Sequence, residues 1–136
     1  MARPVSIAKH VAEQLVEHAR RETKHECCGL LAGRNGVIRR VFAAANAAGD
    51  PATSYEIPPE ELFRLMRAIH AAGLELLGIY HSHPNGKIEP SARDVERAYY
   101  PDAAYFIVSP REDAAQPVRA FSIRDGRVTE LAIEIV

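Results

Sequence analysis

Two histidines and an aspartate between positions 81 and 94 form the strongest chemical signal in the sequence. The stretch reads HSHPNGKIEPSARD. His81 and His83 stand two apart at the end of an apolar run typical of a buried strand, so both imidazoles should leave one face and converge on one ion. Asp94 falls in the first turn of a short helix expected to begin at Ser91, from which its carboxylate can point back. Two imidazoles and one carboxylate leave a fourth tetrahedral position open, as in catalytic zinc sites.

Each part of this pattern also has a simpler interpretation. In a chain with six histidines, an H-x-H occurs by chance in about a quarter of cases. Ser91 and Asp94 alone fit a helix capping box, which needs no metal. The conjunction of His81, His83, Pro84, Ser91 and Asp94 in one register is far rarer by chance, and it favours a metal centre.

The elements around this stretch predict one mixed α/β layer arrangement in a single domain, residues 1–136. Helices are expected over 6–23, with Ser6 as N-cap, over 58–73, ending at Gly73, and from Ser91. An Asn-Gly pair at 35–36 predicts a hairpin turn. Strands are expected over 27–33, 37–45, 55–57, 74–80 and 103–108, followed by a hairpin of 118–123 and 128–135.

Composition excludes several classes of function. The chain has 136 residues, 47% of them hydrophobic and 26% charged, and a net charge of -1. Nucleic-acid binding is disfavoured because such proteins usually carry a basic excess. Neither a secretory signal nor an apolar run long enough for a membrane span is visible. Cys27 and Cys28 are adjacent and cannot form a disulfide framework, so we expect a reducing compartment and a cytoplasmic protein.

Other residues with chemical potential are assigned to structural roles. Cys27 and Cys28 could be nucleophiles or zinc thiolates, but on a strand they would point to opposite faces, and a buried cysteine is usually a core residue. Tyr99 and Tyr100 could line a groove, although packing in the core is the favoured interpretation. His18 lies on a predicted helix and is expected at the surface.

At this point the sequence resembles a known family. H-S-H-P followed by six residues and S-x-x-D is similar to the JAMM signature of the MPN+ metalloproteases. The family's upstream glutamate is matched by Glu26 in the stretch ECCGLL, 55 residues before His81. The resemblance covers nearly the whole chain. It implies the JAMM/MPN fold, an α/β three-layer arrangement with one curved mixed sheet flanked by helices and a layout similar to cytidine deaminases.

The resemblance also implies a role for each matched position. His81, His83 and Asp94 would bind one Zn²⁺ per chain. Glu26 would hold the zinc-bound water, act as general base and pass the proton to the leaving amine. Ser91 would donate a hydrogen bond to the oxyanion of the tetrahedral intermediate. This chemistry is coherent by itself, because zinc lowers the pKa of its water towards about 7 and a nearby carboxylate can then take the proton.

Short prokaryotic members of the family act on ubiquitin-like sulfur carriers that end in Gly-Gly. The resemblance therefore implies a peptidase or isopeptidase that hydrolyses the bond after that Gly-Gly, with residues 54–57 pairing with the tail as an added strand. The regions 47–58 and 94–103 are short beside those of the deubiquitinating members, which argues against linkage-specific polyubiquitin cleavage. Two alternatives stay open: release of cysteine from a sulfur carrier in cysteine biosynthesis, and a silent MPN scaffold that only binds partners. A homodimer is also expected from the resemblance.

Overall fold

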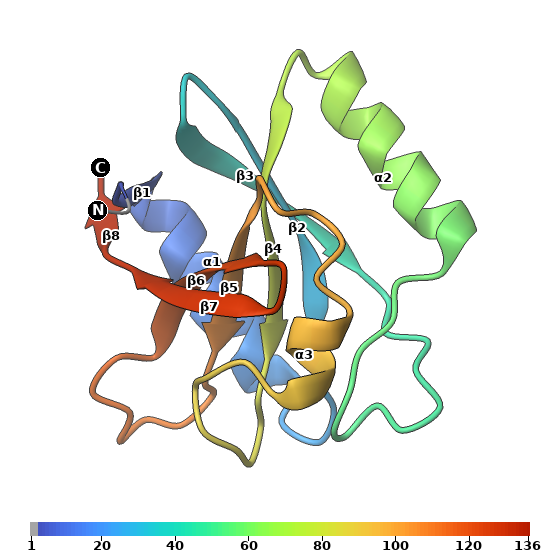
Figure 1. Ribbon diagram of the computed structural model, residues 1–136, viewed down its shortest axis with the longest axis vertical. Helices are drawn as coiled ribbons and strands as arrows, with labels where there is room; N and C mark the ends of the chain where they lie inside the picture. Colours follow the sequence, from blue (N-terminus) through green and yellow to red (C-terminus); the bar gives the residue numbers. More distant parts are fainter. Residues whose placement is uncertain (1–2) are drawn as a thin grey trace.

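Eight strands form one mixed sheet with three helices on its two faces (Figure 1). The computed structural model describes residues 3–136. No helix in this part of the chain is both long and apolar enough to cross a bilayer. The elements are β1 (Val5–Ile7), α1 (Lys9–Arg21), β2 (Cys28–Arg34), β3 (Val37–Ala44), α2 (Pro59–Ala71), β4 (Glu75–Ser82), α3 (Ala92–Glu96), β5 (Ala104–Val108), β6 (Val118–Arg124), β7 (Arg127–Leu131) and β8 (Ile133–Ile135).

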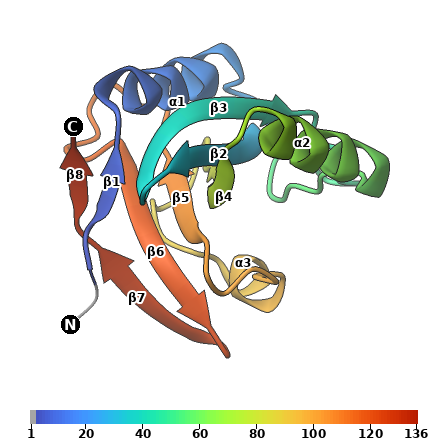
Figure 2. The ribbon, with the colours of Figure 1, turned by 90° about the horizontal axis from the view of Figure 1, so that it is seen from above.

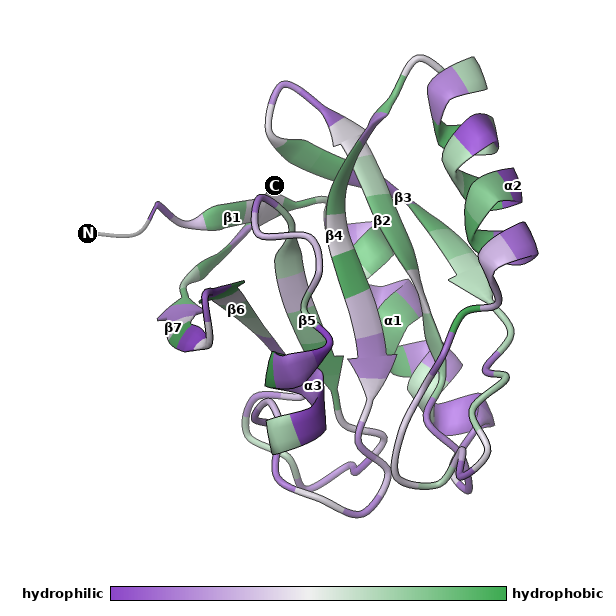
Figure 3. Cartoon of the chain, turned by 45° about the vertical axis from the view of Figure 1, so that its right-hand side comes forward, coloured by the Kyte–Doolittle hydropathy of each residue, from purple (hydrophilic) through white to green (hydrophobic). Residues whose placement is uncertain are grey.

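Alternating side chains of the central strands divide the core into two clusters. Successive residues of a strand face opposite sides of a sheet. Leu31 accordingly packs on the side of α1, together with Leu15 of that helix, whereas Leu30 packs on the side of α2, together with Leu65. The partly buried Val95 of α3 joins the second cluster. The expected three layers are therefore present, and in Figure 3 α2 lies beside the sheet while α1 lies behind it.

The sheet is curved until its two edges nearly meet. The strand order is β7-β6-β5-β4-β2-β3-β1-β8, so the consecutive strands β7 and β8 lie at opposite edges. Only Ala132 separates them in the chain. β8 pairs in parallel with β1, with Val5 opposite Ile133 (Figure 2). This confirms the curved mixed sheet that the family resemblance implied.

The N-terminal helix begins later than predicted. Residues 5–7 form β1, held between β3 and β8, and α1 starts only at Lys9. Ser6 is therefore not the N-cap; its hydroxyl donates to Glu134 at 3.2 Å. Ala8 is the N-cap residue and makes no side-chain capping bond. Pairing with two distant strands outweighs the local helical pattern here, a contact that periodicity cannot reveal.

Two further strand predictions were wrong in detail. Residues 55–57 form no strand within the sheet. The predicted strand 128–135 is broken at Ala132 into β7 and β8, which allows the sheet to curl. The turns were predicted correctly: Asn35 and Gly36 both have positive φ, 54° and 76°, as the hairpin requires. Gly73, with φ 71°, follows α2 as expected.

Gly29 of β2 provides the space that the ring of Tyr80 occupies. A Cβ at this position would lie 2.6 Å from the Phe42 carbonyl oxygen and 2.6 Å from the Tyr80 ring. We expect Gly29→Ala to lower the free energy of unfolding by about 1–3 kcal/mol, because backbone and ring must both move. Urea denaturation would measure the change. Gly49→Ala is the matched control, since nothing lies within 4 Å of its Cβ. Equal stability of the two variants would contradict this account.

Candidate metal centre

The pairing of β2 with β4 brings Glu26 beside the two histidines. In this antiparallel pair Cys28 lies opposite His81. The pairing continues one step further, because the Ser82 amide donates to the Cys27 carbonyl at 3.0 Å and the Cys27 amide donates to the Ser82 hydroxyl at 2.8 Å. Glu26 thus comes next to His83, although the two residues are 57 positions apart in the sequence. Ser82 serves as a backbone anchor between the strands.

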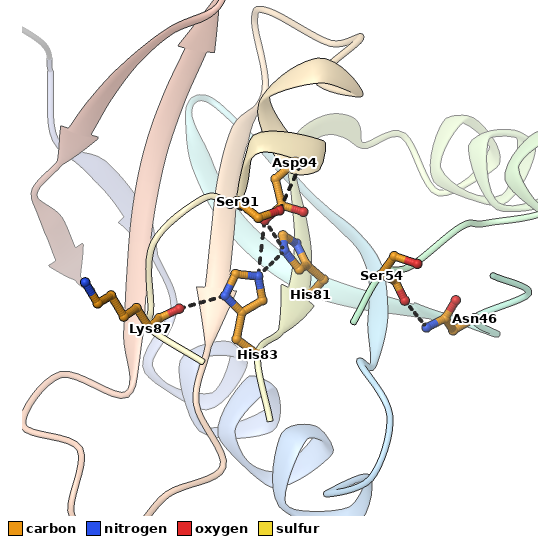
Figure 4. A network of polar contacts seen from close by, with 7 residues as sticks. All are labelled: Asn46, Ser54, His81, His83, Lys87, Ser91 and Asp94. Carbon is orange, nitrogen blue, oxygen red and sulfur yellow. Dashed lines mark hydrogen bonds and ion pairs between the residues drawn. The ribbon is translucent and has the colours of Figure 1, made fainter. Parts of the chain in front are cut away.

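Three donor atoms converge at the end of β4 (Figure 4). Nε2 of His81 and Nε2 of His83 lie 3.0 Å apart, and Oδ2 of Asp94 lies 3.1 Å from each of them. His81 and His83 are buried, with 1% and 8% of their surface exposed. The expectation that both rings leave one face of the strand is confirmed. In Figure 3 the end of β4 at this point is hydrophilic, in contrast to its apolar middle.

The donor set fits a divalent cation. Nδ1 of His83 lies 2.7 Å from the Lys87 carbonyl oxygen, which can only accept, so this nitrogen carries the proton. In a neutral His83 ring, Nε2 then presents a lone pair to the carboxylate of Asp94. Two acceptors at 3.1 Å repel unless a cation or a proton lies between them. Ligands held 2.0–2.1 Å from a tetrahedral zinc ion would be about 3.3 Å apart, close to the distances here.

The short helix α3 fixes Asp94. The Asp94 amide donates to Oγ of Ser91 at 3.1 Å, and the Ser91 amide donates to Oδ2 of Asp94 at 2.9 Å. These two bonds form the capping box that the sequence suggested. The same carboxylate oxygen faces both histidines, so a capping role for Asp94 is compatible with a role as metal ligand. The Ser91 hydroxyl accepts the capping bond and keeps its own proton available for donation.

Glu26 is a buried carboxylate with few hydrogen bonds to offset the loss of its hydration. The residue is 4% exposed, and its Oε1 has no hydrogen-bond partner among residues 3–136. Burial raises the pKa of Glu26 to about 7, while the nearby His83 acts in the opposite direction. One ligand atom each of Glu26, His81 and His83 lie within 4.8 Å of one another. A carboxylate with a pKa near neutrality is suited to taking up and releasing protons.

The other ionisable groups influence one another strongly. Burial lowers the pKa of His81. Burial acts in the same direction on His83, but hydrogen bonds with Asp94 and the Lys87 carbonyl outweigh it and raise the pKa of His83. Burial alone would raise the pKa of Asp94, yet its hydrogen bonds with the two histidines hold it well below its ordinary value. A negative charge on Asp94 is therefore favoured at neutral pH.

Asn46 is a site residue that the sequence reasoning missed. Its amide nitrogen donates to the Ser54 carbonyl at 2.9 Å (Figure 4). It also donates to the Glu26 carbonyl at 3.0 Å, and the Asn46 Oδ1 accepts from the Glu56 amide at 3.1 Å. Asn46 thereby ties the segment 54–57 to the start of β2. A single asparagine in a loop carries no sequence signal for such a role.

Two hollows flank the three donor atoms. A cavity of about 530 Å³ is lined by Glu26, His83 and Ser91. A second one, of about 330 Å³, is lined by Asp94, Tyr55 and Ile57. The structure thus brings all five candidate residues together, with a cavity on either side.

The residues assigned to structural roles give a mixed outcome. Cys27 and Cys28 are free and buried, and burial raises both thiol pKa values, that of Cys28 to about 12, so neither is a thiolate at neutral pH. Tyr99 is 74% exposed, so its predicted core position was wrong; it follows α3 at the surface instead. His18 was expected at the surface but is half-buried, with Nδ1 2.8 Å from the Tyr80 hydroxyl.

Comparison with known proteins identifies the family. Residues 8–124 match the family model described as prokaryotic homologs of the JAB domain. This chain belongs to that family. A desampylase from Haloferax volcanii is 40% identical, covering 96% of both chains. A CysO-cysteine peptidase from Mycobacterium tuberculosis is 37% identical, covering 96% of this chain and 90% of its own. A probable TtuB-protein conjugate cleaving protease from Thermus thermophilus is 35% identical, covering 93% and 81%.

Two solved structures share the fold. A protein from Desulfitobacterium hafniense superposes with a TM-score of 0.83 at 30% identity, covering 96% of this chain and 92% of its own. A structure titled as a JAMM metalloprotease-like zinc site in the proteasome and signalosome superposes with a TM-score of 0.62, covering 96% and 98%. At 18% identity the second likeness concerns the fold alone.

The raised pKa of Glu26 predicts how stability of this JAB protein depends on pH when metal is removed. Because the folded-state pKa of about 7 lies above the ordinary value of 4.5, the unfolded chain loses the Glu26 proton first, and the stability of the fold decreases as pH rises between these values. A difference of this size corresponds to about 3 kcal/mol. In the presence of chelator, we compare the free energy of unfolding of Glu26→Gln with that of the wild type. We expect this difference to shift in favour of Glu26→Gln by about 1–3 kcal/mol between pH 4.5 and pH 8. Chemical denaturation at both pH values measures it, and a pH-independent difference would contradict the prediction.

Proposed function

We propose that this chain is a zinc-dependent peptidase that hydrolyses the bond after the C-terminal Gly-Gly of a ubiquitin-like or sulfur-carrier protein. The observation that carries the proposal is the convergence of His81, His83 and Asp94 within 3.1 Å of one another, with buried Glu26 alongside. Two imidazoles and one carboxylate are the donor set of a catalytic zinc site.

In this proposal the three converging residues hold the metal and Glu26 stays free. When bound, zinc lowers the pKa of a coordinated water to about 7 and polarises the scissile carbonyl. Asp94 is a better third ligand than Glu26, because its Oδ2 lies 3.1 Å from Nε2 of both histidines. A hydrogen bond from the Ser91 amide also holds this oxygen in place. His83 is held in the ligating tautomer by the Lys87 carbonyl.

Glu26 and Ser91 supply proton transfer and a hydrogen bond. Glu26, whose pKa of about 7 leaves the ionised form well populated at neutral pH, accepts a proton from the attacking water and delivers it to the leaving amine. The Ser91 hydroxyl, whose proton is not used by the capping box, donates to the negative charge that develops on the carbonyl oxygen. No side chain of the protein becomes a covalent nucleophile.

The segment 54–57 is suited to hold the substrate tail. Ser54 and Glu56 direct their backbone groups inward, towards Asn46, Ala47 and Asp50. Within residues 3–136 the backbone groups of Tyr55 and Ile57 have no hydrogen-bonding partner. Alternate free groups along one side are what an added strand requires. Glycines in the tail would approach the metal without a clashing Cβ.

The relatives support this class of substrate and are compatible with two leaving groups, a conjugated protein and a cysteine. Desampylase and TtuB-conjugate cleaving protease are names for proteins that act on conjugates, whereas CysO-cysteine peptidase names the release of cysteine. Cysteine release by this chain is therefore the second candidate activity. The silent scaffold is disfavoured, because all five residues of the signature are present and gathered at one place.

We also propose a cytoplasmic location, which agrees with two free, buried cysteines that form no disulfide. Homodimer formation stays a prediction from the family resemblance. Sedimentation velocity of the purified chain would measure its mass in solution.

Zinc content separates ligands from the proton carrier. We expect His81→Ala, His83→Ala and Asp94→Ala to lose stoichiometric zinc, whereas Glu26→Gln retains it. Atomic absorption after dialysis measures the content. His70→Ala is the control, because this histidine is exposed on α2. If Glu26→Gln lost zinc and Asp94→Ala kept it, the two carboxylates would have exchanged the roles proposed here.

Cleavage of a defined carrier tests the function itself. The substrates are a ubiquitin-like carrier extended past Gly-Gly by a single cysteine, and the same carrier joined to a lysine side chain. We expect chelator-sensitive cleavage after Gly-Gly, reduced about 10²–10⁴-fold by Glu26→Gln, the usual contribution of a general base. Glu13→Gln on the exposed side of α1 is the control.

The two substrates also distinguish the candidate activities. Release of cysteine alone would favour the biosynthetic reaction, and cleavage of the lysine conjugate would favour deconjugation. No cleavage of either substrate by a chain that holds one zinc would overturn the proposed activity and favour a binding role.

A further inference from the structure

The two histidines of the centre are oriented by different means. Metal-bound histidines usually donate the N–H of their second ring nitrogen to a carbonyl or carboxylate, which fixes the ring. His83 follows this rule through the Lys87 carbonyl, at 2.7 Å. Nδ1 of His81 is buried and has no hydrogen-bond partner among residues 3–136. The His81 ring therefore lacks the hydrogen bond that usually orients a ligand from its second nitrogen, and another contact can take that place.

That contact is an aromatic stack. The ring of Tyr55 lies over the His81 imidazole, with centroids 4.5 Å apart and an angle of 22° between the planes. A near-parallel arrangement at this distance is favourable for aromatic rings. The stack also shields the imidazole from water, and His81 is 1% exposed.

Tyr55 is itself held firmly. Both of its neighbours in the chain, Ser54 and Glu56, are bound by the Asn46 side chain, which also binds the backbone of Glu26. Asn46 thus fixes the backbone around Tyr55 relative to the start of β2. This strand pairs with β4, which carries His81. A ring anchored in this way can restrict its neighbour.

We propose that Tyr55 is the positioning residue of His81, taking the place of the missing hydrogen bond at Nδ1 and holding Nε2 on the metal. The role rests on the proposed function, because it requires His81 to be a zinc ligand. Tyr55 belongs to the segment 54–57 that we assign to the substrate tail, so one short segment contacts both the tail and a metal ligand.

Substitutions at Tyr55 that keep or remove the ring test the role. Tyr55→Phe retains the stack, whereas Tyr55→Leu and Tyr55→Met remove it. Tyr99→Leu is the matched control, because Tyr99 lines the same cavity and is 74% exposed. Zinc affinity is measured by competition with a chromogenic chelator. The absorption spectrum of the Co²⁺-substituted protein reports ligand geometry without any substrate.

We expect Tyr55→Leu and Tyr55→Met to weaken zinc binding about 10–100-fold, the usual effect of removing a group that orients a ligand. Their Co²⁺ spectra should shift, while Tyr55→Phe and Tyr99→Leu should stay within about twofold of the wild type in affinity and keep its spectrum. Thermal unfolding of the metal-free variants checks that they are folded. Because either Tyr55→Leu or Tyr55→Met is sufficient for the test, the experiment needs only one of them to fold.

Two outcomes would overturn the role. Wild-type zinc affinity and an unchanged Co²⁺ spectrum in a folded Tyr55→Leu or Tyr55→Met would show that the stack only fills space. Weakened binding in Tyr55→Phe as well would assign the effect to the hydroxyl group. A wild-type chain that binds no zinc would instead overturn the proposed function together with this role, so the two failures are distinguishable.

Discussion

The antiparallel register between β2 and β4 is the constraint on which the site depends. With Cys28 opposite His81, the residues that precede β2 fall beside the end of β4, and the Ser82 backbone and hydroxyl lock them there. A slip of one residue would turn His81 and His83 to the other face of the sheet and carry Glu26 out of reach. Gly29 allows this close pairing, because Tyr80 occupies the space of its absent side chain.

Charge is the second constraint. Glu26, His81, His83 and Asp94 gather within a few ångströms in surroundings where unpaired charges are costly. The capping box and the Lys87 carbonyl satisfy only part of their hydrogen-bonding capacity. A divalent cation would satisfy the converging lone pairs, and its binding free energy would then add to the stability of the fold. Such an ion would link the chemistry and the stability of this end of the sheet.

The segment 54–57 lies between the proposed binding site of the substrate tail and the metal centre. Asn46 binds the backbone of Glu26, Ser54 and Glu56 at once, and Tyr55 between the latter two covers His81. Larger insertions are not needed for this arrangement. In the proposed function, the outer backbone groups of this segment would pair with an incoming strand, while its inner groups bind Asn46, Ala47 and Asp50.

Local rules made much of the site predictable from the sequence. The strand period of two set the common direction of His81 and His83, and the capping box placed Asp94 beside Ser91. The hairpin turns and the limits of α2 follow from equally local preferences of Asn, Gly and Pro. The family pattern added Glu26, which no local rule connects to the histidines.

The tertiary structure alone decided what depends on contacts between distant parts of the chain. β1 forms because β3 and β8 lie on either side of it, and Tyr99 is exposed because no element covers it. The stack of Tyr55 on His81 and the bonds of Asn46 join residues that no periodicity relates. The sequence by itself determined which donor groups exist and which of them share a face, since those relations are local. Their distances, their burial and the groups that orient them were set by strand pairing and loop packing across the whole fold.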